Sequence, residues 1–174
     1  MITDQQISIQ SEIDHCNHHT QLFTPSDLDM MVGQGSLQKF QKTEFDVCNE
    51  TTLQGTKRLW DSGRFSKIAA LNFASARNPG GGFRSGSEAQ EESLARNTAL
   101  YSSLLTAGKY YEYHRHQHSG LYSHHMILSP ACLSFRNDDA SLISNYPATF
   151  ITSPASNAQG CFILKICLGK TSIF

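Results

Sequence analysis

The sequence is organised around one stretch, Asn78-Pro-Gly-Gly-Gly-Phe-Arg-Ser-Gly-Ser-Glu-Ala-Gln-Glu-Glu-Ser-Leu-Ala-Arg96. It follows an apolar run, Ile68 to Ala74, that predicts a buried strand, and it leads into an amphipathic run that reaches Leu105. Three consecutive glycines leave the backbone free to adopt positive φ angles and remove every Cβ that would keep a ligand away. The stretch therefore predicts a strand, a loop that a ligand can approach closely, and a helix.

The helix after the loop is predicted to start with two adjacent carboxylates. Ser87 is a suitable N-cap, and Gln90 three residues later completes the pattern of a capping box. Glu91 and Glu92 then fall in the first turns of the helix. The alternative to a functional site is a structural turn followed by solvated acidic residues, which the helix dipole favours at this end. A connecting turn rarely needs three glycines, so we favour a functional site.

These residues resemble the signature of a known family, the poly(ADP-ribose) glycohydrolases. The signature consists of Gly80-Gly81-Gly82, a gap of seven residues, and Gln90-Glu91-Glu92. The flanking segments Leu71 to Pro79 and Ser93 to Arg96 resemble the microbial type of that family in particular. The resemblance extends from about Thr43 to Asn157, which is most of the chain.

The resemblance implies an α/β fold of the macrodomain-like kind, in which three layers, α/β/α, contain a mixed sheet that binds ADP-ribose at its strand ends. It implies an enzyme that hydrolyses ribose–ribose O-glycosidic bonds in poly(ADP-ribose) and releases ADP-ribose, without a cofactor or a metal. The expected partner is the polymer or an ADP-ribosylated protein. A non-catalytic ADP-ribose-binding module and an inactive remnant are the alternatives.

Members of the family continue beyond the point at which this chain ends, and Cys161 to Phe174 does not resemble their continuation. We therefore expect a domain that is incomplete at its C-terminus. Residues 1–35 are expected to be a polar, weakly structured lead-in, and residues 36–174 the catalytic domain.

Glycoside chemistry explains why two carboxylates would be needed. Cleavage passes through an oxocarbenium-like state, and the leaving oxygen requires a proton. By the resemblance, Glu92 protonates the leaving ribose oxygen and Glu91 holds ribose hydroxyls. Each carboxylate can raise the pKa of the other, whereas the helix N-terminus favours the charged form. The resemblance assigns substrate contacts to Asn78, Gly80, Gly81, Gly82, Phe83 and Gln90.

Composition argues against several other classes of protein. The 174 residues suit one domain, and the formal net charge of -1 gives no chain-wide attraction for DNA or an anionic membrane. No apolar stretch approaches the length of a membrane span, and no secretory signal is visible at the start. The five cysteines are scattered and odd in number, which favours free thiols in a reducing compartment. We expect an intracellular, cytoplasmic protein, with a nuclear location as the alternative.

The segment from Lys109 to His125 interleaves histidines with tyrosines. On a strand, His114, His116 and His118 would share one face, and imidazole is a common metal ligand. No familiar ligand spacing accompanies them, so we favour a polar surface over a metal site. An aromatic and basic surface for RNA, or ordinary edge-strand packing, are further interpretations of Tyr110, Tyr111, Tyr113 and Arg115.

Strands and helices alternate along the rest of the chain, which indicates a layered sheet with parallel pairs. Gly108 is expected to end the helix predicted at Glu88–Leu105, and Pro130 is expected to break a strand. The remaining elements that we predict are a strand at Thr43–Cys48, helices at Thr51–Asp61 and Glu88–Leu105, and strands at Met126–Phe135, Thr149–Thr152 and Cys161–Leu168.

Overall fold

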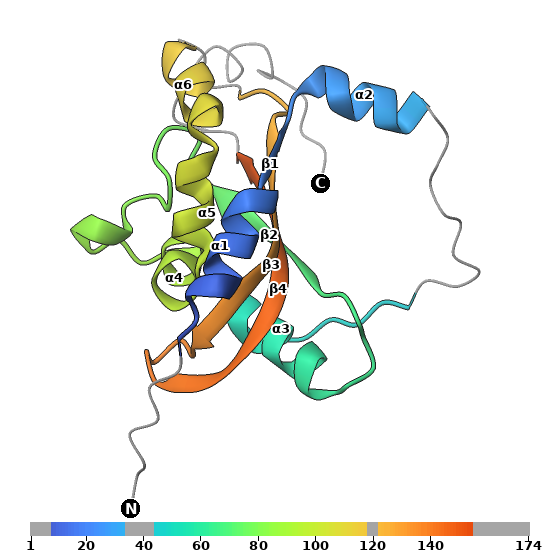
Figure 1. Cartoon of the computed structure of the whole chain (residues 1–174), viewed down its shortest axis with the longest axis vertical. Helices are drawn as coiled ribbons and strands as arrows, with labels where there is room; N and C mark the ends of the chain where they lie inside the picture. The colour runs from blue at the N-terminus through green and yellow to red at the C-terminus, as the bar shows by residue number, and fades with distance from the viewer. Residues whose placement is uncertain (1–7, 34–43, 118–121, 155–174) are drawn as a thin grey trace, which may run out of the picture.

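The computed structural model describes residues 8–33, 44–117 and 122–154. Within these residues the chain forms six α-helices, one 3-10 helix and four strands (Figure 1). In chain order they are α1 (Gln10–His19), β1 (Gln21–Phe23), α2 (Pro25–Gly33), α3 (Thr52–Asp61), β2 (Ala69–Ala74), η1 (Phe83–Ser85), α4 (Gln90–Asn97), α5 (Leu100–Thr106), α6 (Gly108–His116), β3 (Met126–Arg136) and β4 (Leu142–Pro154).

The four strands form one mixed sheet in the order β1-β3-β4-β2. β3 pairs antiparallel with both β1 and β4, and β2 pairs in parallel with β4. In the parallel pair, Ala69 lies opposite Thr149 and Ala74 opposite Pro154. The predicted mixed α/β fold with a parallel pair is therefore confirmed. In the described part of the chain, β2 is an edge strand, which matters for the site.

The core lies on one face of this sheet. Alternate residues of β4, namely Tyr146, Ala148 and Phe150, are buried and join one apolar cluster with Cys16 of α1 and Leu100 of α5. The alternation arises because successive side chains of a strand point to opposite faces. Figure 1 shows α1, α4, α5 and α6 gathered on one side of the sheet. The side chains on that face thus fix the position of α4, which carries the two glutamates.

The opposite face of β2 is open in the described part of the chain. Leu71 and Phe73 of β2 have exposed fractions of 43% and 60%, whereas their neighbours Asn72 and Ala74 are buried. The second helical layer of the expected α/β/α arrangement therefore does not cover β2 within the residues described.

The strand predicted at Thr43–Cys48 is wrong over residues 44–48, which form no strand; Thr43 itself lies outside the described residues. Its two apolar side chains, Phe45 and Val47, are 91% and 97% exposed. The side chain of Asp46 instead lies 3.6 Å from Arg58 of α3. An alternating pattern favours a strand only where a neighbouring strand is available, and none of the four strands in the described residues pairs with this segment.

The single helix predicted at Glu88–Leu105 is also wrong, because the chain breaks between α4 and α5. Thr98 is extended, with φ -136° and ψ 171°, and it forms a β-bridge with Ser134 of β3. The N–H of Ala99 donates to the carbonyl of Leu133 at 2.9 Å. Contacts with β3 therefore take over backbone groups that a continuous helix would have used internally.

The segment after Gly108, for which edge-strand packing was one interpretation, forms the helix α6, and Gly108 is the first residue of that helix. Tyr110, Tyr111 and His114 are buried, and the two tyrosine rings meet edge to face with centroids 4.8 Å apart. Aromatic packing on a helix therefore explains the interleaved sequence. The interpretation as an aromatic RNA surface is wrong, because two of its three tyrosines lie in the interior.

The lead-in expected to be weakly structured is wrong for residues 8–33. α1 packs against β3, and its Cys16 is fully buried in the core. The helix predicted at Thr51–Asp61 is confirmed, with Thr51 and Gln54 forming a capping box. The predicted strand break near Pro130 is confirmed by a register shift between Ser129 and Cys132.

β4 is longer than the strand predicted at Thr149–Thr152, because it begins at Leu142 after a tight hairpin turn. The strand predicted at Cys161–Leu168 lies outside the described residues. No helix in residues 8–33, 44–117 or 122–154 combines the length and apolar character that crossing a bilayer requires.

The hairpin between β3 and β4 provides a test of backbone strain. Ala140 in this turn is exposed and has a φ of 64°, a region that favours glycine. We predict that Ala140→Gly raises the free energy of unfolding by about 1 kcal/mol. Ala140→Val should lower it, because a β-branched side chain tolerates this φ poorly. Chemical denaturation of both variants measures the difference, and equal stability would show that the turn is unstrained.

Candidate functional site

The loop after β2 is folded by its own backbone and by one serine. The hydroxyl of Ser75 accepts from the N–H groups of Arg77 and Asn78, at 3.3 and 3.1 Å. The carbonyl of Asn78 accepts from the N–H of Gly81 at 3.0 Å, and the Asn78 side chain is exposed. Gly80 and Gly81 have φ angles of 69° and 61°. These positive angles close the loop back towards α4, and they explain the glycines.

Glu91 of α4 is held against the end of β2. Its side chain is 3% exposed, and its Oε2 accepts from the backbone N–H of Ser75 at 2.7 Å. Its other oxygen, Oε1, is buried and has no hydrogen-bond partner in the described part of the chain. A buried acceptor without a donor is costly. A ligand hydroxyl would remove that cost.

Glu92 is held by the glycine loop itself. Its Oε1 accepts from the backbone N–H of Gly82 at 2.9 Å, and its side chain is 9% exposed. Gly81 lies between the two carboxylates: a Cβ there would fall 2.9 Å from Cδ of Glu92 and 3.1 Å from Oε2 of Glu91. The glycine at position 81 therefore meets two needs, because it has a positive φ and because the carboxylates occupy the space of a side chain.

Burial raises the pKa of Glu91 from its ordinary value of 4.5 to about 7. The N–H of Ser75 and the side chain of Asn72 act in the opposite direction, because they stabilise the carboxylate. The negative charge of Glu92 raises the pKa further, but it is a smaller influence than burial. The sequence predicted mutual repulsion between the carboxylates, and the structure makes burial the main cause.

Gln90 does not complete the predicted capping box. Ala89, not Ser87, is the N-cap of α4, and it makes no side-chain capping bond. The carboxamide of Gln90 instead bonds the backbone of β2 at Leu71 and Phe73. The carbonyl of Ser87 accepts from the guanidinium of Arg96 in the last turn of α4. The predicted start of the helix was therefore wrong by two residues, while both glutamates do lie in its first turn.

Phe83 begins the 3-10 helix η1 after the glycines and is half-buried. Its ring meets that of Tyr101 edge to face, with centroids 4.7 Å apart. A Cβ on Gly80 would fall 3.0 Å from the Phe83 ring and 3.1 Å from the Tyr101 ring. The aromatic pair thus fixes the outer side of the glycine loop against α5.

The sequence analysis missed Asn72, which lies in the middle of β2. Asn72 is fully buried, and its Nδ2 donates to the hydroxyl of Thr152 in β4 at 3.2 Å. Its side chain also lowers the pKa of Glu91, which places it beside that carboxylate. Its Oδ1 is buried without a partner in the described part of the chain. The signal was a single amide in an otherwise apolar strand, since buried polar groups need a purpose or a partner.

The histidines weighed as metal ligands are not brought together on one face. His114 is buried and hydrogen-bonds the carbonyl of Tyr110 and the hydroxyl of Ser123, at 2.8 and 2.9 Å. His116 is exposed on α6, and His118 lies outside the described residues. Across the described ranges, no group of three or more histidine, cysteine, aspartate or glutamate side chains is arranged to hold a metal.

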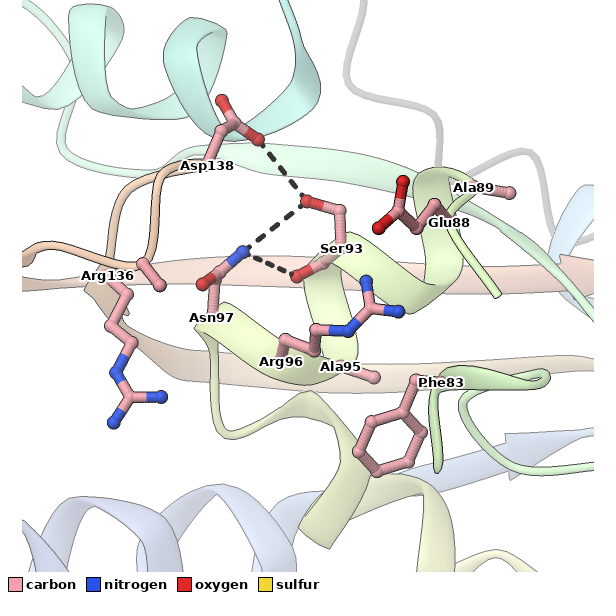
Figure 2. Close-up of a pocket in the computed structure, with 10 residues that line it drawn as sticks. Phe83, Glu88, Ala89, Ser93, Ala95, Arg96, Asn97, Arg136 and Asp138 are labelled. Carbon is pink, nitrogen blue, oxygen red and sulfur yellow. Dashed lines mark hydrogen bonds between the residues drawn. The ribbon is translucent and has the colours of Figure 1, made fainter. Parts of the chain in front are cut away.

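A hollow of about 580 Å³ lies along α4 (Figure 2). Neither Glu91 nor Glu92 lines it. The hydroxyl of Ser93 donates to Asp138 at 3.3 Å, and Nδ2 of Asn97 donates to the carbonyl of Ser93 at 3.0 Å, as Figure 2 shows. These bonds tie the middle of α4 to the β3–β4 turn. The hollow therefore lies between α4 and the β3–β4 turn, away from the two carboxylates.

Comparison with known proteins gives one family. The family model described as microbial-type PARG, catalytic domain, matches residues 2–137. A search of curated proteins gave no match.

Several solved structures are similar. A poly(ADP-ribose) glycohydrolase from Thermomonospora curvata is 38% identical with a TM-score of 0.85, covering 91% of this chain and 58% of that one. The same enzyme bound to the inhibitor ADP-HPD gives a TM-score of 0.82 at 38% identity, covering 91% and 57%. The enzyme from Deinococcus radiodurans in complex with ADP-ribose is 40% identical with a TM-score of 0.75, covering 84% and 58%. The chain thus spans less than two thirds of the length of these relatives.

The raised pKa of Glu91 predicts a pH-dependent stability. The folded protein keeps the carboxyl proton of Glu91 to higher pH than the unfolded chain does, so this group contributes to the free energy of unfolding at low pH. It is lost as the pH rises from about 4.5 to about 7. Glu91→Gln should remove this loss and be more stable than the wild type at pH 8, by on the order of 2 kcal/mol.

Denaturation of both proteins at pH 4.5 and pH 8 measures this difference, and carboxyl NMR locates the titration directly. A stability difference that does not change with pH would contradict the burial of Glu91 as the cause.

Proposed function

Because the chain belongs to the family of microbial-type PARG catalytic domains, we propose that it hydrolyses ribose–ribose O-glycosidic bonds in poly(ADP-ribose) and releases ADP-ribose. The family was inferred from the sequence motif, and that inference is confirmed. One observation supports the proposed activity above all. Two adjacent, buried carboxylates, Glu91 and Glu92, are each held by one backbone N–H at the mouth of a glycine loop.

Glu92 is the proposed general acid. It is the more exposed of the two carboxylates, and Gly82 holds only one of its oxygens. Its other oxygen has no partner among the described residues and is therefore available to carry a proton. In the reaction, this proton passes to the leaving ribose oxygen as the glycosidic C–O bond breaks. Water adds to the anomeric carbon of the other ribose and gives up a proton, which restores the acid.

Glu91 is the proposed positioning group for the ribose. Its buried, unpaired Oε1 accepts a hydrogen bond from a ribose hydroxyl, which supplies the donor that the protein lacks. Since its pKa is raised to about 7, Glu91 binds the hydroxyl as an acceptor best when the pH exceeds that value. Burial thus gives the two neighbouring glutamates different environments, and the proposal gives them different tasks.

The remaining substrate contacts are proposed for the loop. The exposed Asn78 and the backbone of Gly80, Gly81 and Gly82 face a ligand that approaches the carboxylates, and Phe83 offers an aromatic surface beside them. The proposed partner is poly(ADP-ribose) or an ADP-ribosylated protein. The free thiols of Cys16, Cys48 and Cys132 are consistent with a proposed reducing, intracellular location.

Exchanging each carboxylate for its amide tests the two roles separately. Glu92→Gln keeps the size of the side chain but has no carboxylic proton, so we expect hydrolysis to fall by about 10²–10⁴-fold with little change in ADP-ribose affinity. Glu91→Gln should weaken ADP-ribose binding as well as hydrolysis, because its partner hydroxyl is present in ground and transition states alike.

Release of ADP-ribose from polymer and calorimetric titration with ADP-ribose provide the two measurements. Hydrolysis by Glu92→Gln at the wild-type rate would overturn the assignment of the acid. Binding without any turnover by the wild type would replace the enzyme with an ADP-ribose-binding module.

A second test concerns the space between the carboxylates. Gly81→Ala places a Cβ against Glu91 and Glu92 and strains a φ of 61°, so we expect ADP-ribose affinity to fall by at least tenfold, on the order of 1–2 kcal/mol. Gly63→Ala is the matched control, because Gly63 has a similar φ of 64° and no atom lies within 4 Å of its added Cβ. Equal affinity in the two variants would mean that Gly81 only shapes a turn.

A further inference from the structure

β2 is an edge strand in the described part of the chain. Two backbone groups on its outer edge nevertheless form hydrogen bonds, with a side chain instead of a strand. The carbonyl of Ile68 accepts from the N–H of Thr149 in β4, so the backbone of even-numbered residues in this strand faces β4. Because peptide groups alternate along a strand, those of Leu71 and Phe73 face the opposite, open edge. The side chain of Gln90 lies at this edge.

The carboxamide of Gln90 pairs with this edge as a neighbouring strand would. Its Oε1 accepts from the N–H of Phe73 at 2.9 Å, and its Nε2 donates to the carbonyl of Leu71 at 2.7 Å. A carboxamide carries the same acceptor and donor as a peptide group. One side chain of α4 therefore forms the hydrogen bonds that one residue of a neighbouring strand would form.

The same amide makes a third bond. Nε2 of Gln90 also donates to the hydroxyl of Thr52, the first residue of α3, at 3.1 Å. Both N–H groups of the amide and its oxygen thus form hydrogen bonds within the protein, to β2 and to α3. The N-cap of α4 makes no side-chain bond, and this amide ties the start of the helix to β2 and α3.

We infer that Gln90 is the positioning residue of the site, and that its bonds to the β2 edge set where α4 presents Glu91 and Glu92. The expected effect of Gln90 on hydrolysis rests on the proposed function, whereas its effect on the position of α4 does not. Three consecutive side chains bond three successive segments: Gln90 the edge of β2, Glu91 the N–H of Ser75, and Glu92 the N–H of Gly82. A shift of the helix by about 1 Å breaks all three, and such shifts cost about 10²-fold in rate.

The test compares Gln90→Met with Gln54→Met. Methionine keeps the length of the side chain and removes its hydrogen bonds. Gln54 is an exposed capping residue of α3 whose Oε1 accepts from the N–H of Thr51. Gln54→Met therefore also removes a hydrogen bond at the start of a helix, but it leaves the bonds at the β2 edge intact. Three quantities are measured in the full chain: amide hydrogen exchange at Phe73, the pKa of Glu91 by carboxyl NMR, and the hydrolysis of polymer.

In Gln90→Met we expect faster exchange at Phe73, a pKa of Glu91 that moves from about 7 towards its ordinary value, and a fall of about 10²-fold in kcat that exceeds any rise in KM. Gln54→Met should match the wild type in all three. Wild-type exchange at Phe73 together with a wild-type pKa of Glu91 in Gln90→Met would overturn the inference.

Gln90→Glu is expected to restore the bonds to the β2 edge at low pH, which a purely structural role of Gln90 does not predict. A neutral carboxyl accepts from Phe73 and donates to Leu71 as the amide does, whereas a carboxylate repels the carbonyl of Leu71. Relative to wild type at the same pH, the protection of Phe73 in Gln90→Glu should recover as the pH falls, while Gln90→Met stays unprotected. Equal protection of Phe73 in both variants at every pH would contradict the bond pattern.

The outcomes separate the two proposals. If the wild type neither binds ADP-ribose nor hydrolyses polymer, the proposed function fails, while exchange at Phe73 and the pKa of Glu91 still decide the position of the helix. If the wild type is active and Gln90→Met has wild-type kcat and KM, the positioning role fails and the proposed function survives.

Discussion

The site depends on two hydrogen bonds from the backbone to neighbouring carboxylates. The N–H of Ser75, just after β2, donates to Glu91, and the N–H of Gly82, at the end of the glycine triplet, donates to Glu92. Two adjacent glutamates on a helix would otherwise point to solvent, because burial of a charge costs more than a first-turn dipole returns. The loop must therefore fold back over α4, and the positive φ angles of Gly80 and Gly81 let it do so.

The same constraint explains the arrangement of the surrounding elements. The edge of β2 is paired by a side chain of α4, while the middle of the helix is tied to the β3–β4 turn through Ser93 and Asp138. Thr98 then breaks the helix by bridging to Ser134 of β3. α4 is thus held at its start, middle and end by three parts of one sheet. Such support from neighbouring residues is what gives a pair of functional groups a defined geometry.

Burial gives the two carboxylates unequal properties although they are neighbours in sequence. Glu91 is enclosed by β2 and the loop, and Asn72 lies beside it in the interior. Glu92 lies nearer to solvent, under the glycine loop. Burial therefore raises the pKa of Glu91 and leaves Glu92 the more accessible of the two carboxylates. The unpaired buried oxygens of Glu91 and Asn72 mark the polar interior that a ligand hydroxyl would complete.

The sequence by itself determined the local features of this protein: a strand before the glycine loop, the loop itself, the place of Glu91 and Glu92 in the first turn of a helix, and the family to which the motif belongs. Each depends on neighbouring residues, so composition and spacing suffice. Only the tertiary structure decided what depends on distant partners. Contacts with β3 split the long helix at Thr98, and residues 44–48 form no strand because no strand of the described residues pairs with them. The use of Gln90 at the edge of β2, instead of in a capping box, likewise required strand and helix to be placed together, because a side-chain amide bonds whichever backbone groups packing brings within reach.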